Sequence, residues 1–561
     1  MSVARKNFVS RKLKTALTSL REGYRLLRHR GPGQIQFWFI ALLVGTAAGF
    51  AALFFRKGVN ALQTFLYGHE DVRLLHSFAE SLPWYLILII PICGGLVVGV
   101  ILHRFTNDAR ARSVADVIYG AALKDGRVET KAGLASTLAS MVTLGTGGST
   151  GREGPVVHLA AVISTWVNRR ILADGITGRD LLGCAVAAAV SASFNAPIAG
   201  ALFALEVVLR HFAVHAFAPI VIASAAGTVI NRLEFGGVTE FALGTVNEVQ
   251  FYQELPAYLL LGLVCGLVAV ALMKAIFLAD DFGSELQMRW SIPRWLRPAI
   301  AGALLGTIAI YYPHIIGVGY ETTFLALNGQ LFLWDAIVFA IIKTAAVAIT
   351  MAGRMGGGVF SPSLMIGALT GLSFGLIATS IFPEVSGSIS IYALAGMGAV
   401  AAAVLGAPIS TTLIVFELTG DWQTGLAVMV AVSLSTALAS QLVHRSFFLT
   451  QLERRDIHLA AGPQAYLLAM FRVSAVVRTR DDLLKTERDI CQKMMVQGIH
   501  IQRNATLEAA MPLFDAGHNL VPVVSLSAGA GPPQLIGALF HVDALKIYNK
   551  ALAATAAEEH S

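Results

Sequence analysis

Charged residues are scarce in this sequence: they make up 14% of its 561 residues, whereas 55% are hydrophobic. A soluble domain carries about 25% charged residues, so this composition excludes a soluble globular protein of the same size. Apolar runs long enough for spanning helices recur between residues 37 and 443, as at Phe37–Phe55, Trp84–Leu102 and Leu259–Met273. Because lipid cannot bond the backbone, these runs predict helices, and the short alternating segments of a membrane β-barrel are missing.

Cysteine is equally rare, with four residues in the whole chain. Cys93, Cys184 and Cys265 lie within apolar runs, and Cys491 lies in the polar C-terminal part. This spacing provides neither a disulfide framework nor a set of metal ligands. We therefore interpret the cysteines as packing residues and expect no metal and no cofactor.

A removable signal peptide is not expected, because no short apolar run lies near residue 10. Residues 1–34 instead form a basic leader in which Glu22 is the single acidic residue. The positive-inside rule then predicts a cytoplasmic N-terminus, and Arg445, Arg454 and Arg455 predict the same side for the chain after the last apolar run. The number of spans is therefore expected to be even. A net charge of +7 gathered at these ends does not indicate nucleic-acid binding.

The membrane region, residues 35–455, repeats itself at a nearly constant offset. Phe194–Ile198 recurs as Leu405–Ile409 after 211 residues, and Gly151–Pro155 recurs as Gly358–Pro362 after 207 residues. Two further sets keep the order: Pro91, Gly95 and Gly99 with Pro298, Gly302 and Gly306, and Gly45, Gly49 and Lys57 with Gly262, Gly266 and Lys274. Chance is the alternative, because glycine and proline are common in membrane helices. The ordered pairs favour duplicated halves at about 37–232 and 256–445, which often run in opposite directions around a substrate site in mid-bilayer.

Four apolar segments are interrupted by glycine-rich turns that lead into proline, at residues 145–155, 194–197, 356–362 and 406–408. Proline suits the first position of a helix, so each segment predicts a helix that begins inside the membrane. A helix start carries unpaired N–H groups and a partial positive charge, so several that converge would form an anion site without a basic side chain. Binding at such a site is weak enough for the ion to leave. The alternative is that the breaks only kink the helices.

Glu153 is the most informative single residue, because it is an ionisable residue in a glycine-rich break within apolar sequence. Beside helix starts its carboxylate can occupy the anion site as a tethered competitor, and protonation should release it. We therefore predict that Glu153 both gates the pathway and carries a proton. A structural pair with Arg152 or an exposed loop position is the alternative.

The motifs together resemble the CLC family of chloride channels and chloride/proton antiporters. The likeness is carried by Gly-Arg-Glu-Gly-Pro-x-x-His at 151–158, Phe-Asn-Ala-Pro at 194–197, Gly-Val-Phe-Ser-Pro at 358–362 and Ala-Pro-Ile at 407–409. Order, spacing and symmetry match over residues 37–455. The resemblance implies an all-α membrane protein, an inverted-repeat helical bundle with broken and re-entrant helices. It also implies a multi-pass protein of the cell membrane, here the bacterial inner membrane.

The resemblance assigns roles to residues of this chain. It implies that Glu153 is the gating glutamate and that backbone N–H groups around Glu153–Gly154 and Val359–Phe360 coordinate the anion. The candidate anion-binding residues are Ser113, Arg152, Glu153, Gly154, Val359, Phe360 and Phe448. The resemblance further implies a homodimer in the lipid bilayer, with one chloride pathway in each subunit.

Three positions depart from the family pattern. The usual Gly-Ser-Gly-Ile-Pro loop is replaced by Arg112–Asp116, which keeps Ser113. The tyrosine that usually follows the last span is replaced by Phe448, whose ring cannot donate a hydrogen bond. The inner proton-accepting glutamate of coupled members is replaced by Val207.

The loss of the hydroxyl and of the inner relay favours a chloride channel or weakly coupled transporter. A strict chloride/proton antiporter is the alternative, so protons remain open as a second substrate. Glu206, next to Val207, belongs to the altered inner proton site. We interpret it and its repeat mate Glu417 as buried, hydrogen-bonded residues near helix ends. Pro155 and Ser113 favour chloride over fluoride and nitrate.

An intramembrane serine hydrolase is a remote alternative. Gly147–Gly151 fits a Gly-x-Ser-x-Gly pattern with Ser149 at its centre, and His158 lies nearby. However, the sequence before it does not predict the strand that a nucleophile elbow needs. The same glycines lack the Gly-Lys-Ser/Thr ending of a P-loop. We therefore expect a transport protein rather than an enzyme.

From residue 462 the composition becomes polar, and residues 462–552 predict a separate cytoplasmic α/β domain. Strands are expected at 500–502, 521–524 and 535–540, and helices at 507–516 and 542–551. This order, with Gly537 and Asp543, resembles a single CBS module. Such modules usually pair and bind adenine nucleotides, but residues 463–498 are too irregular for a first copy, so a dimer-stabilising tail without ligand is the alternative. Residues 553–561 are expected to be flexible.

Overall fold

The computed structural model describes residues 33–68, 74–171, 175–210, 212, 214–236, 251–457, 459, 471–503, 505–525 and 534–560. The basic leader up to residue 32 lies outside the described residues. The chain divides into a membrane unit, Met1–Leu209 with Phe217–Ile457, and a tail unit, Arg210–Ala216 with His458–Ser561. The boundary after residue 457 lies close to the predicted change in composition.

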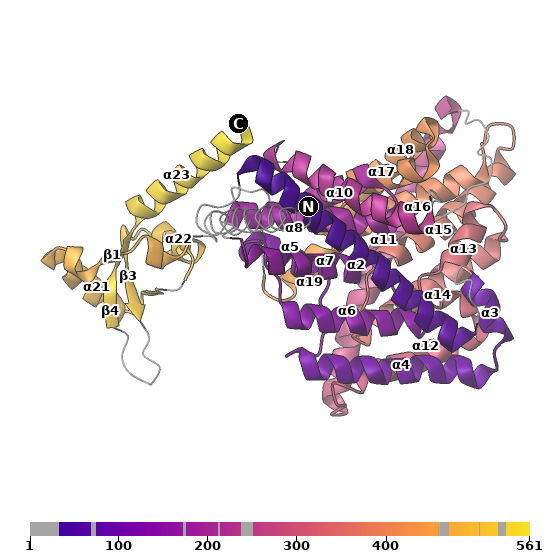
Figure 1. Ribbon diagram of the computed structural model, residues 1–561, viewed down its shortest axis with the longest axis horizontal. Helices are drawn as coiled ribbons and strands as arrows, with labels where there is room; N and C mark the ends of the chain where they lie inside the picture. Colours follow the sequence, from indigo (N-terminus) through magenta and orange to yellow (C-terminus); the bar gives the residue numbers. More distant parts are fainter. Residues whose placement is uncertain are drawn as a thin grey trace, which may run out of the picture. The chain divides into compact units, whose positions relative to one another are not determined.

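The membrane unit is built from helices throughout (Figure 1). Its first half contains α2 Gln34–Tyr67, α3 Leu75–Ser81, α4 Trp84–Phe105, α5 Val114–Leu123, α6 Thr130–Gly145, α7 Glu153–Asn168, α8 Gly175–Phe194, α9 Pro197–Phe203, a π-helix Ala204–Leu209 and α10 Val214–Phe235. Its second half contains α11 Phe251–Arg289, α12 Arg297–Tyr311, a 3₁₀ turn Pro313–Ile315, α13 Tyr320–Leu327, α14 Leu333–Ala352, α15 Phe360–Ile381, α16 Ile389–Leu405, α17 Pro408–Thr419, α18 Trp422–Leu442 and α19 Phe447–Glu453.

Seven helical stretches of the described residues are long and apolar enough to cross a membrane. The three apolar runs named from the sequence lie in α2, α4 and α11, so their assignment as helices is confirmed. Five further apolar helices have only 10–17 residues. Helices this short do not span a hydrocarbon core of about 30 Å, as expected for a bundle with broken helices. The even number of spans and the orientation remain predictions.

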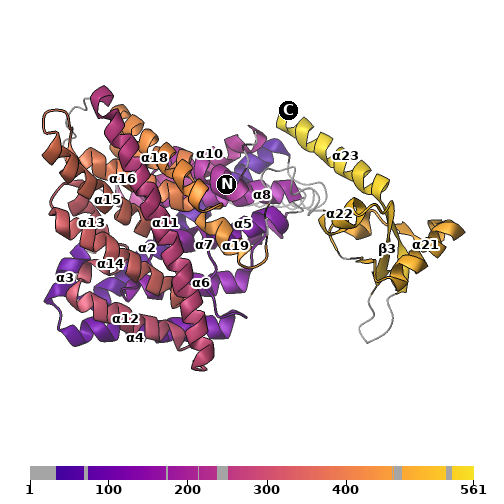
Figure 2. The same ribbon diagram turned by 180° about the vertical axis from the view of Figure 1, so that it is seen from behind.

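The two halves contact each other through matching glycines. A Cβ atom added at Gly95 would lie 2.4 Å from the carbonyl oxygen of Pro298, and one at Gly302 would lie 2.1 Å from that of Pro91. The glycine of each half thus packs against the proline of the other half. Such reciprocal contacts are those that a two-fold axis produces. The helices concerned, α4 and α12, lie side by side in Figure 1 and, seen from behind, in Figure 2. Only glycine permits this backbone approach.

A second pair of helices repeats the same packing. A Cβ atom added at Gly45 of α2 would lie 2.7 Å from the carbonyl oxygen of Ala223 in α10, and one at Gly262 of α11 would lie 2.7 Å from that of Ala431 in α18. Equivalent glycines therefore meet equivalent partners within each half. The duplication predicted from the sequence is confirmed by these contacts.

All four interrupted segments lead into helices. Pro197 and Pro408 are the first residues of α9 and α17, as predicted. The helices α7 and α15 begin at Glu153 and Phe360, two residues before their prolines. The expectation that proline opens each helix is therefore wrong for these two. Proline is tolerated there because no N–H group of the first turn has a partner within the helix.

The tail unit contains a four-stranded sheet with the order β1-β4-β3-β2. Its regular elements are β1 Arg478–Thr479, α21 Lys485–Val496, β2 Ile501–Gln502, α22 Leu507–Asp515, β3 Leu520–Ser525, β4 Gln534–Phe540 and α23 His541–His560, with 3₁₀ turns at Val473–Ala475 and Arg480–Asp482. The strands β2 and β3 are parallel, and the other pairs are antiparallel. Apolar side chains of both layers form its core, with Phe514 stacked on His541 at 4.7 Å between ring centroids.

The predicted order of strands and helices after residue 500 is confirmed. Two differences concern its ends. The irregular stretch before residue 498 provides β1 and α21, and β1 pairs with β4, so this stretch completes the same sheet. At the other end α23 continues to His560, where the sequence predicts a flexible end.

Candidate functional site

The candidate site lies where α7 and α15 begin, one helix from each half. Gly151 and Gly358 pair through two backbone hydrogen bonds, with N···O distances of 2.7 and 2.9 Å. The Thr150 hydroxyl also donates to the Gly358 carbonyl at 2.9 Å. These bonds hold the two helix starts side by side. Their unpaired N–H groups and partial positive charges consequently act on the same region.

Glu153 is the first residue of α7 and is 2% exposed. The Ser361 hydroxyl, from the first turn of α15, donates to its Oε1 atom at 2.5 Å. Its other oxygen, Oε2, has no hydrogen-bond partner among the described residues. A Cβ atom at Gly151 would lie 2.7 Å from this oxygen, so glycine is needed there to make room for the carboxylate. The carboxylate of one half is therefore held by the helix start of the other.

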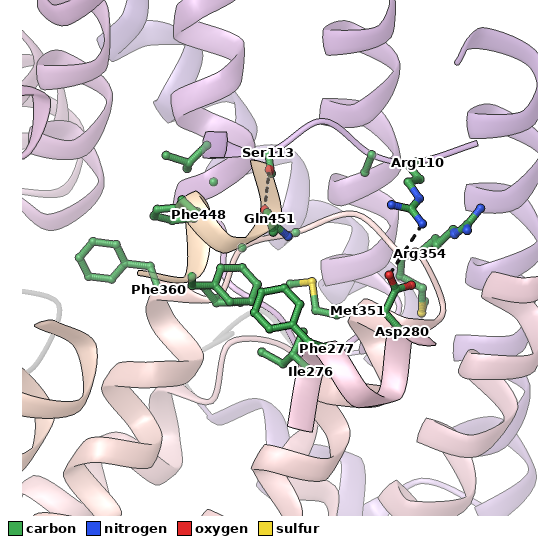
Figure 3. Close-up of a pocket in the computed structure, with 18 of the residues that line it drawn as sticks. Arg110, Ser113, Ile276, Phe277, Asp280, Met351, Arg354, Phe360, Phe448 and Gln451 are labelled. Atoms are coloured by element: carbon green, nitrogen blue, oxygen red, sulfur yellow. Dashed lines mark hydrogen bonds and ion pairs between the residues drawn. The ribbon is translucent and has the colours of Figure 1, made fainter. Parts of the chain in front are cut away.

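A cavity of about 350 Å³ lies beside these helix starts. Glu153 and Gly154 of α7 line it together with Val359 and Phe360 of α15. The start of α5, with Ser113 as its N-cap, contributes a third helix end. Aromatic rings form much of the remaining wall, from Phe203, Phe277, Phe360, Phe447 and Phe448. Figure 3 labels three of them, Phe277, Phe360 and Phe448. Three helix starts and an apolar wall suit a small anion that has lost part of its water.

Ser113 reaches the cavity from the end of α5. Its N–H group donates to Oδ2 of Asp116 at 2.7 Å, and its hydroxyl donates to Oε1 of Gln451 at 3.2 Å (Figure 3). Gln451 lines the cavity one turn after Phe448 in α19. A carboxamide has two N–H donors beside its oxygen. Gln451 therefore provides polar hydrogens next to the ring that lacks a hydroxyl.

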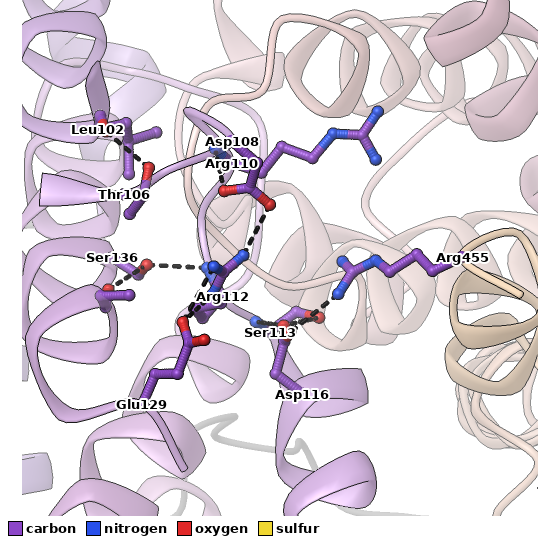
Figure 4. A network of polar contacts seen from close by, with 11 residues as sticks. Leu102, Thr106, Asp108, Arg110, Arg112, Ser113, Asp116, Glu129, Ser136 and Arg455 are labelled. Atoms are coloured by element: carbon purple, nitrogen blue, oxygen red, sulfur yellow. Dashed lines mark hydrogen bonds and ion pairs between the residues drawn. The ribbon is translucent and has the colours of Figure 1, made fainter. Parts of the chain in front are cut away.

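The loop before Ser113 is fixed by ion pairs, shown in Figure 4. The Arg112 guanidinium bonds Asp108 at 2.8 Å and Glu129 at 3.0 Å, and its backbone N–H donates to Ser136 at 2.8 Å. Burial alone would raise the pKa of Asp108, but the hydrogen bond and charge of Arg112 lower it below its usual value. Asp108 is therefore ionised at neutral pH. This network holds Ser113 in place although the usual glycine-rich loop is missing.

Arg152 does not reach the cavity. Its Nη2 atom donates to the carbonyl oxygen of Ser193 at 3.0 Å, and its guanidinium lies 5.1 Å from the ring centroid of Tyr320. Its Nε atom is 3.9 Å from Oε1 of Glu153. Arg152 lines a separate, smaller pocket instead. Arg152 and Glu153 are adjacent, but their side chains point to different sides of the helix start. Direct anion binding by Arg152 is therefore not supported.

The starts of α9 and α17 do not reach the cavity either. Glu206 accepts hydrogen bonds from the N–H groups of Ile409 and Ser410, at 2.9 and 2.8 Å. Reciprocally, Glu417 accepts one from Ala199 at 2.8 Å. Each half thus caps a helix of the other, which confirms that both glutamates are hydrogen-bonded near helix ends, although both are half-buried rather than buried. Of the four interrupted segments, the two that lead into α7 and α15 therefore reach the cavity, and the starts of α9 and α17 are bonded to carboxylates instead.

The two remaining departures lie in apolar surroundings. Val207 is 5% exposed in the π-helix Ala204–Leu209, and Phe448 is 3% exposed at the cavity wall. Neither side chain can donate or accept a proton.

The hydrolase interpretation is wrong. The Ser149 hydroxyl is buried and has no hydrogen-bond partner among the described residues, so no base contacts it. His158 lies elsewhere, with Nδ1 at 3.3 Å from the carbonyl oxygen of Ser113. A nucleophile needs a base within hydrogen-bond distance, and this pair does not provide one.

Sequence reasoning missed most polar residues of the cavity wall, among them Gln451 and Arg354. Arg354 stands just before the glycines at 356–358, and Gln451 stands one helical turn after Phe448. Polar residues this close to predicted site residues are a usable signal. Whether their side chains point toward the cavity, however, depends on contacts between segments that are distant in sequence.

Comparison with known proteins identifies the family of this chain. A family model described as voltage gated chloride channel matches residues 94–440. The putative chloride channel protein ClcB-like of Ralstonia nicotianae is 30% identical over 455 residues, covering 80% of this chain and 98% of that protein. A slow cyanobacterial Cl⁻/H⁺ antiporter has a similar structure, with a TM-score of 0.67, 20% identity and coverage of 76% of this chain and 98% of that one. The structure of a eukaryotic CLC transporter is also similar, with a TM-score of 0.64 and 18% identity. The match covers 90% of this chain and 97% of that one. The chain therefore belongs to the voltage-gated chloride channel family, also called CLC, whose members are membrane channels and transporters rather than enzymes.

Proposed function

We propose that this chain carries chloride across a membrane through the cavity between α5, α7, α15 and α19, with Glu153 as a protonatable gate. The observation that carries this proposal is the buried Glu153 carboxylate beside two paired helix starts, with Oε2 unbonded among the described residues. A carboxylate and a chloride ion are both stabilised by such N–H groups, so they compete for one place. Protonation removes the charge of Glu153 and favours the anion.

We further propose passive conduction or weakly coupled transport. Coupled exchange needs a second protonatable group on the other side of the anion site, and Val207 is an apolar residue there. The phenyl ring of Phe448 offers no hydrogen bond to hold the ion. Strict chloride/proton exchange is the second candidate, because one similar structure is described as a Cl⁻/H⁺ antiporter.

Reconstitution into liposomes with a chloride gradient, with chloride and proton flux recorded together, tests both parts. Chloride flux with few or no accompanying protons is expected. Uphill proton movement driven by chloride would establish exchange instead. Absence of any anion flux, from protein shown to be folded and inserted, would contradict the function itself.

The proposed assembly is a homodimer in the bacterial inner membrane, with one pathway per subunit and both termini cytoplasmic. Two repeat-related residues support a shared face: Ile198 of α9 and Ile409 of α17 are 55% and 47% exposed. Paired apolar positions on neighbouring helices suit either lipid or a second copy. Molar mass in detergent, measured by light scattering, separates dimer from monomer. We propose the tail as a dimer-stabilising domain, and adenine nucleotide binding is its alternative.

A further inference from the structure

Seven charged residues line the cavity, four of them arginines. Two of these arginines are neutralised by acidic partners. Arg454 forms an ion pair with Asp281, and Arg455 forms one with Asp116 at 2.8 Å. These pairs leave no net charge for an anion to bind. The remaining arginines of the wall are Arg110 and Arg354.

Arg110 shares one carboxylate, that of Asp280, with a third guanidinium, that of Arg297. Asp280 lies 2.9 Å from Nη2 of Arg297 and 3.7 Å from Nη2 of Arg110. Arg297 is buried and makes further hydrogen bonds to Ala352 and neighbouring side chains, so it is the better-held partner. Figure 3 shows Arg110 and Arg354 both close to Asp280. Asp280 is thus held by Arg297 and Arg110, and Asp108, the other carboxylate that acts on Arg354, is paired with Arg112.

Arg354 is the cation of this group that lacks a partner. Its Nε atom is buried without a hydrogen bond, and it forms no ion pair with any described residue. Burial, together with Arg110 and Arg297 nearby, lowers the pKa of Arg354 to about 10, so it remains charged at neutral pH. Its backbone φ is 56°, a conformation that residues other than glycine rarely adopt. A half-buried charge without a counterion attracts a mobile one.

We propose that Arg354, with Arg110 beside it, forms a second anion position at the polar end of the cavity, where chloride is held before it reaches the helix starts. This inference rests on the proposed function, since the ion it names is the transported one. The position differs from the site at α7 and α15 because guanidinium groups, rather than backbone N–H groups, hold the ion. A fixed charge in a low-dielectric cavity raises the local concentration of oppositely charged ions and their rate of arrival.

The test compares Arg354→Gln with Arg454→Gln, which removes the same charge from the same cavity but from a paired residue. Chloride flux in liposomes is measured against chloride concentration at low and high concentrations of an impermeant salt. Arg354→Gln should raise the half-saturating chloride concentration on the order of tenfold at low salt and leave maximal flux unchanged. The Arg454→Gln variant should change the half-saturating chloride concentration by about twofold or less. Arg354→Lys keeps the charge, so its half-saturating chloride concentration should lie close to that of the wild-type protein.

A direct readout is the anomalous scattering of bromide in crystals of the wild-type protein and of Arg354→Gln. A bromide peak beside Arg354 that the variant loses supports the second position. Equal half-saturation in both variants, or a wild-type protein without that peak, overturns it. A site that takes sulfate but not bromide also overturns it, since the ion would not be the transported one. If no chloride flux occurs at all, the proposed function fails, and the bromide peak alone decides about Arg354.

Discussion

Gly151 and Gly358 exchange two backbone hydrogen bonds across 207 residues of sequence, and this contact joins the two halves at the start of α7 and α15. Because both residues stand just before a helix start, the pairing brings two electropositive helix ends together without any basic side chain. Glu153 then follows on one side and Ser361 on the other, and the two side chains bond each other.

Substitution of Glu153 by Gln should remove the pH dependence of chloride flux. The amide has nearly the same shape but cannot ionise, so it no longer competes with the anion for the N–H groups at the starts of α7 and α15. At neutral pH the variant should conduct at the rate that the wild-type protein reaches at low pH. Flux in liposomes over roughly pH 4 to 8 measures this, spanning the usual range of carboxyl titration. Retained pH dependence in the variant would assign the gate to another residue.

Substitution of Ser361 by Ala should move the flux profile toward higher pH by about one to two units, since a hydrogen bond to a charged group contributes about 1.5–3 kcal/mol. The Ser361 hydroxyl donates to the Glu153 carboxylate at 2.5 Å and so favours its charged form. Without it the carboxylate accepts a proton more readily. Ser363→Ala is the matched control, because that hydroxyl bonds the Phe360 carbonyl instead. Identical profiles for the two variants would exclude this role of Ser361.

Substitution of Phe448 by Tyr should tighten chloride binding by at least about tenfold, since a hydrogen bond to a charged group contributes about 1.5–3 kcal/mol. The ring already lines the cavity, so its hydroxyl would point toward the ion. Gln451→Leu should weaken binding by a similar factor because it removes the nearest carboxamide donors. Titration calorimetry with chloride measures both. Unchanged affinity in both variants would place the ion away from α19.

Replacing Glu206 or Glu417 by Gln should lower stability by about 1–2 kcal/mol each, because each carboxylate caps a helix start of the other half. Chloride flux per folded molecule should not change, since neither residue lines the cavity. Thermal unfolding in detergent measures the loss, with the exposed Glu285→Gln as control. Loss of proton flux without loss of stability would instead identify Glu206 as part of a proton path.

Much of the fold could be predicted because membrane helices leave a local signal. Apolar runs located α2, α4 and α11, and glycine-proline breaks located the starts of α7, α9, α15 and α17. Repeated motifs also predicted the duplication, since equivalent residues such as Pro91 and Pro298 face equivalent glycines. These signals lie within a few residues of one another in the chain. Physical chemistry of short segments was therefore sufficient for them.

The rest depends on contacts between segments about 200 residues apart. Nothing near Glu206 or Glu417 in sequence indicates that each caps a helix of the opposite half. For the same reason the sequence could not separate Arg152, which turns to Ser193, from Glu153, which turns to Ser361. The unpaired charge of Arg354 likewise appears only when its neighbours are placed. These contacts could not be predicted from a single sequence.

The competition between the Glu153 carboxylate and the anion is tested most directly by the chloride affinity of the purified protein as a function of pH. Titration calorimetry of the wild-type protein and of Glu153→Gln at several pH values provides it. Wild-type affinity should rise by at least about tenfold as the carboxyl group becomes neutral, a change of about 1.4 kcal/mol. Glu153→Gln should bind chloride at every pH with the affinity that the wild-type protein reaches at low pH. A wild-type affinity independent of pH, with a variant that binds no better, would contradict the account.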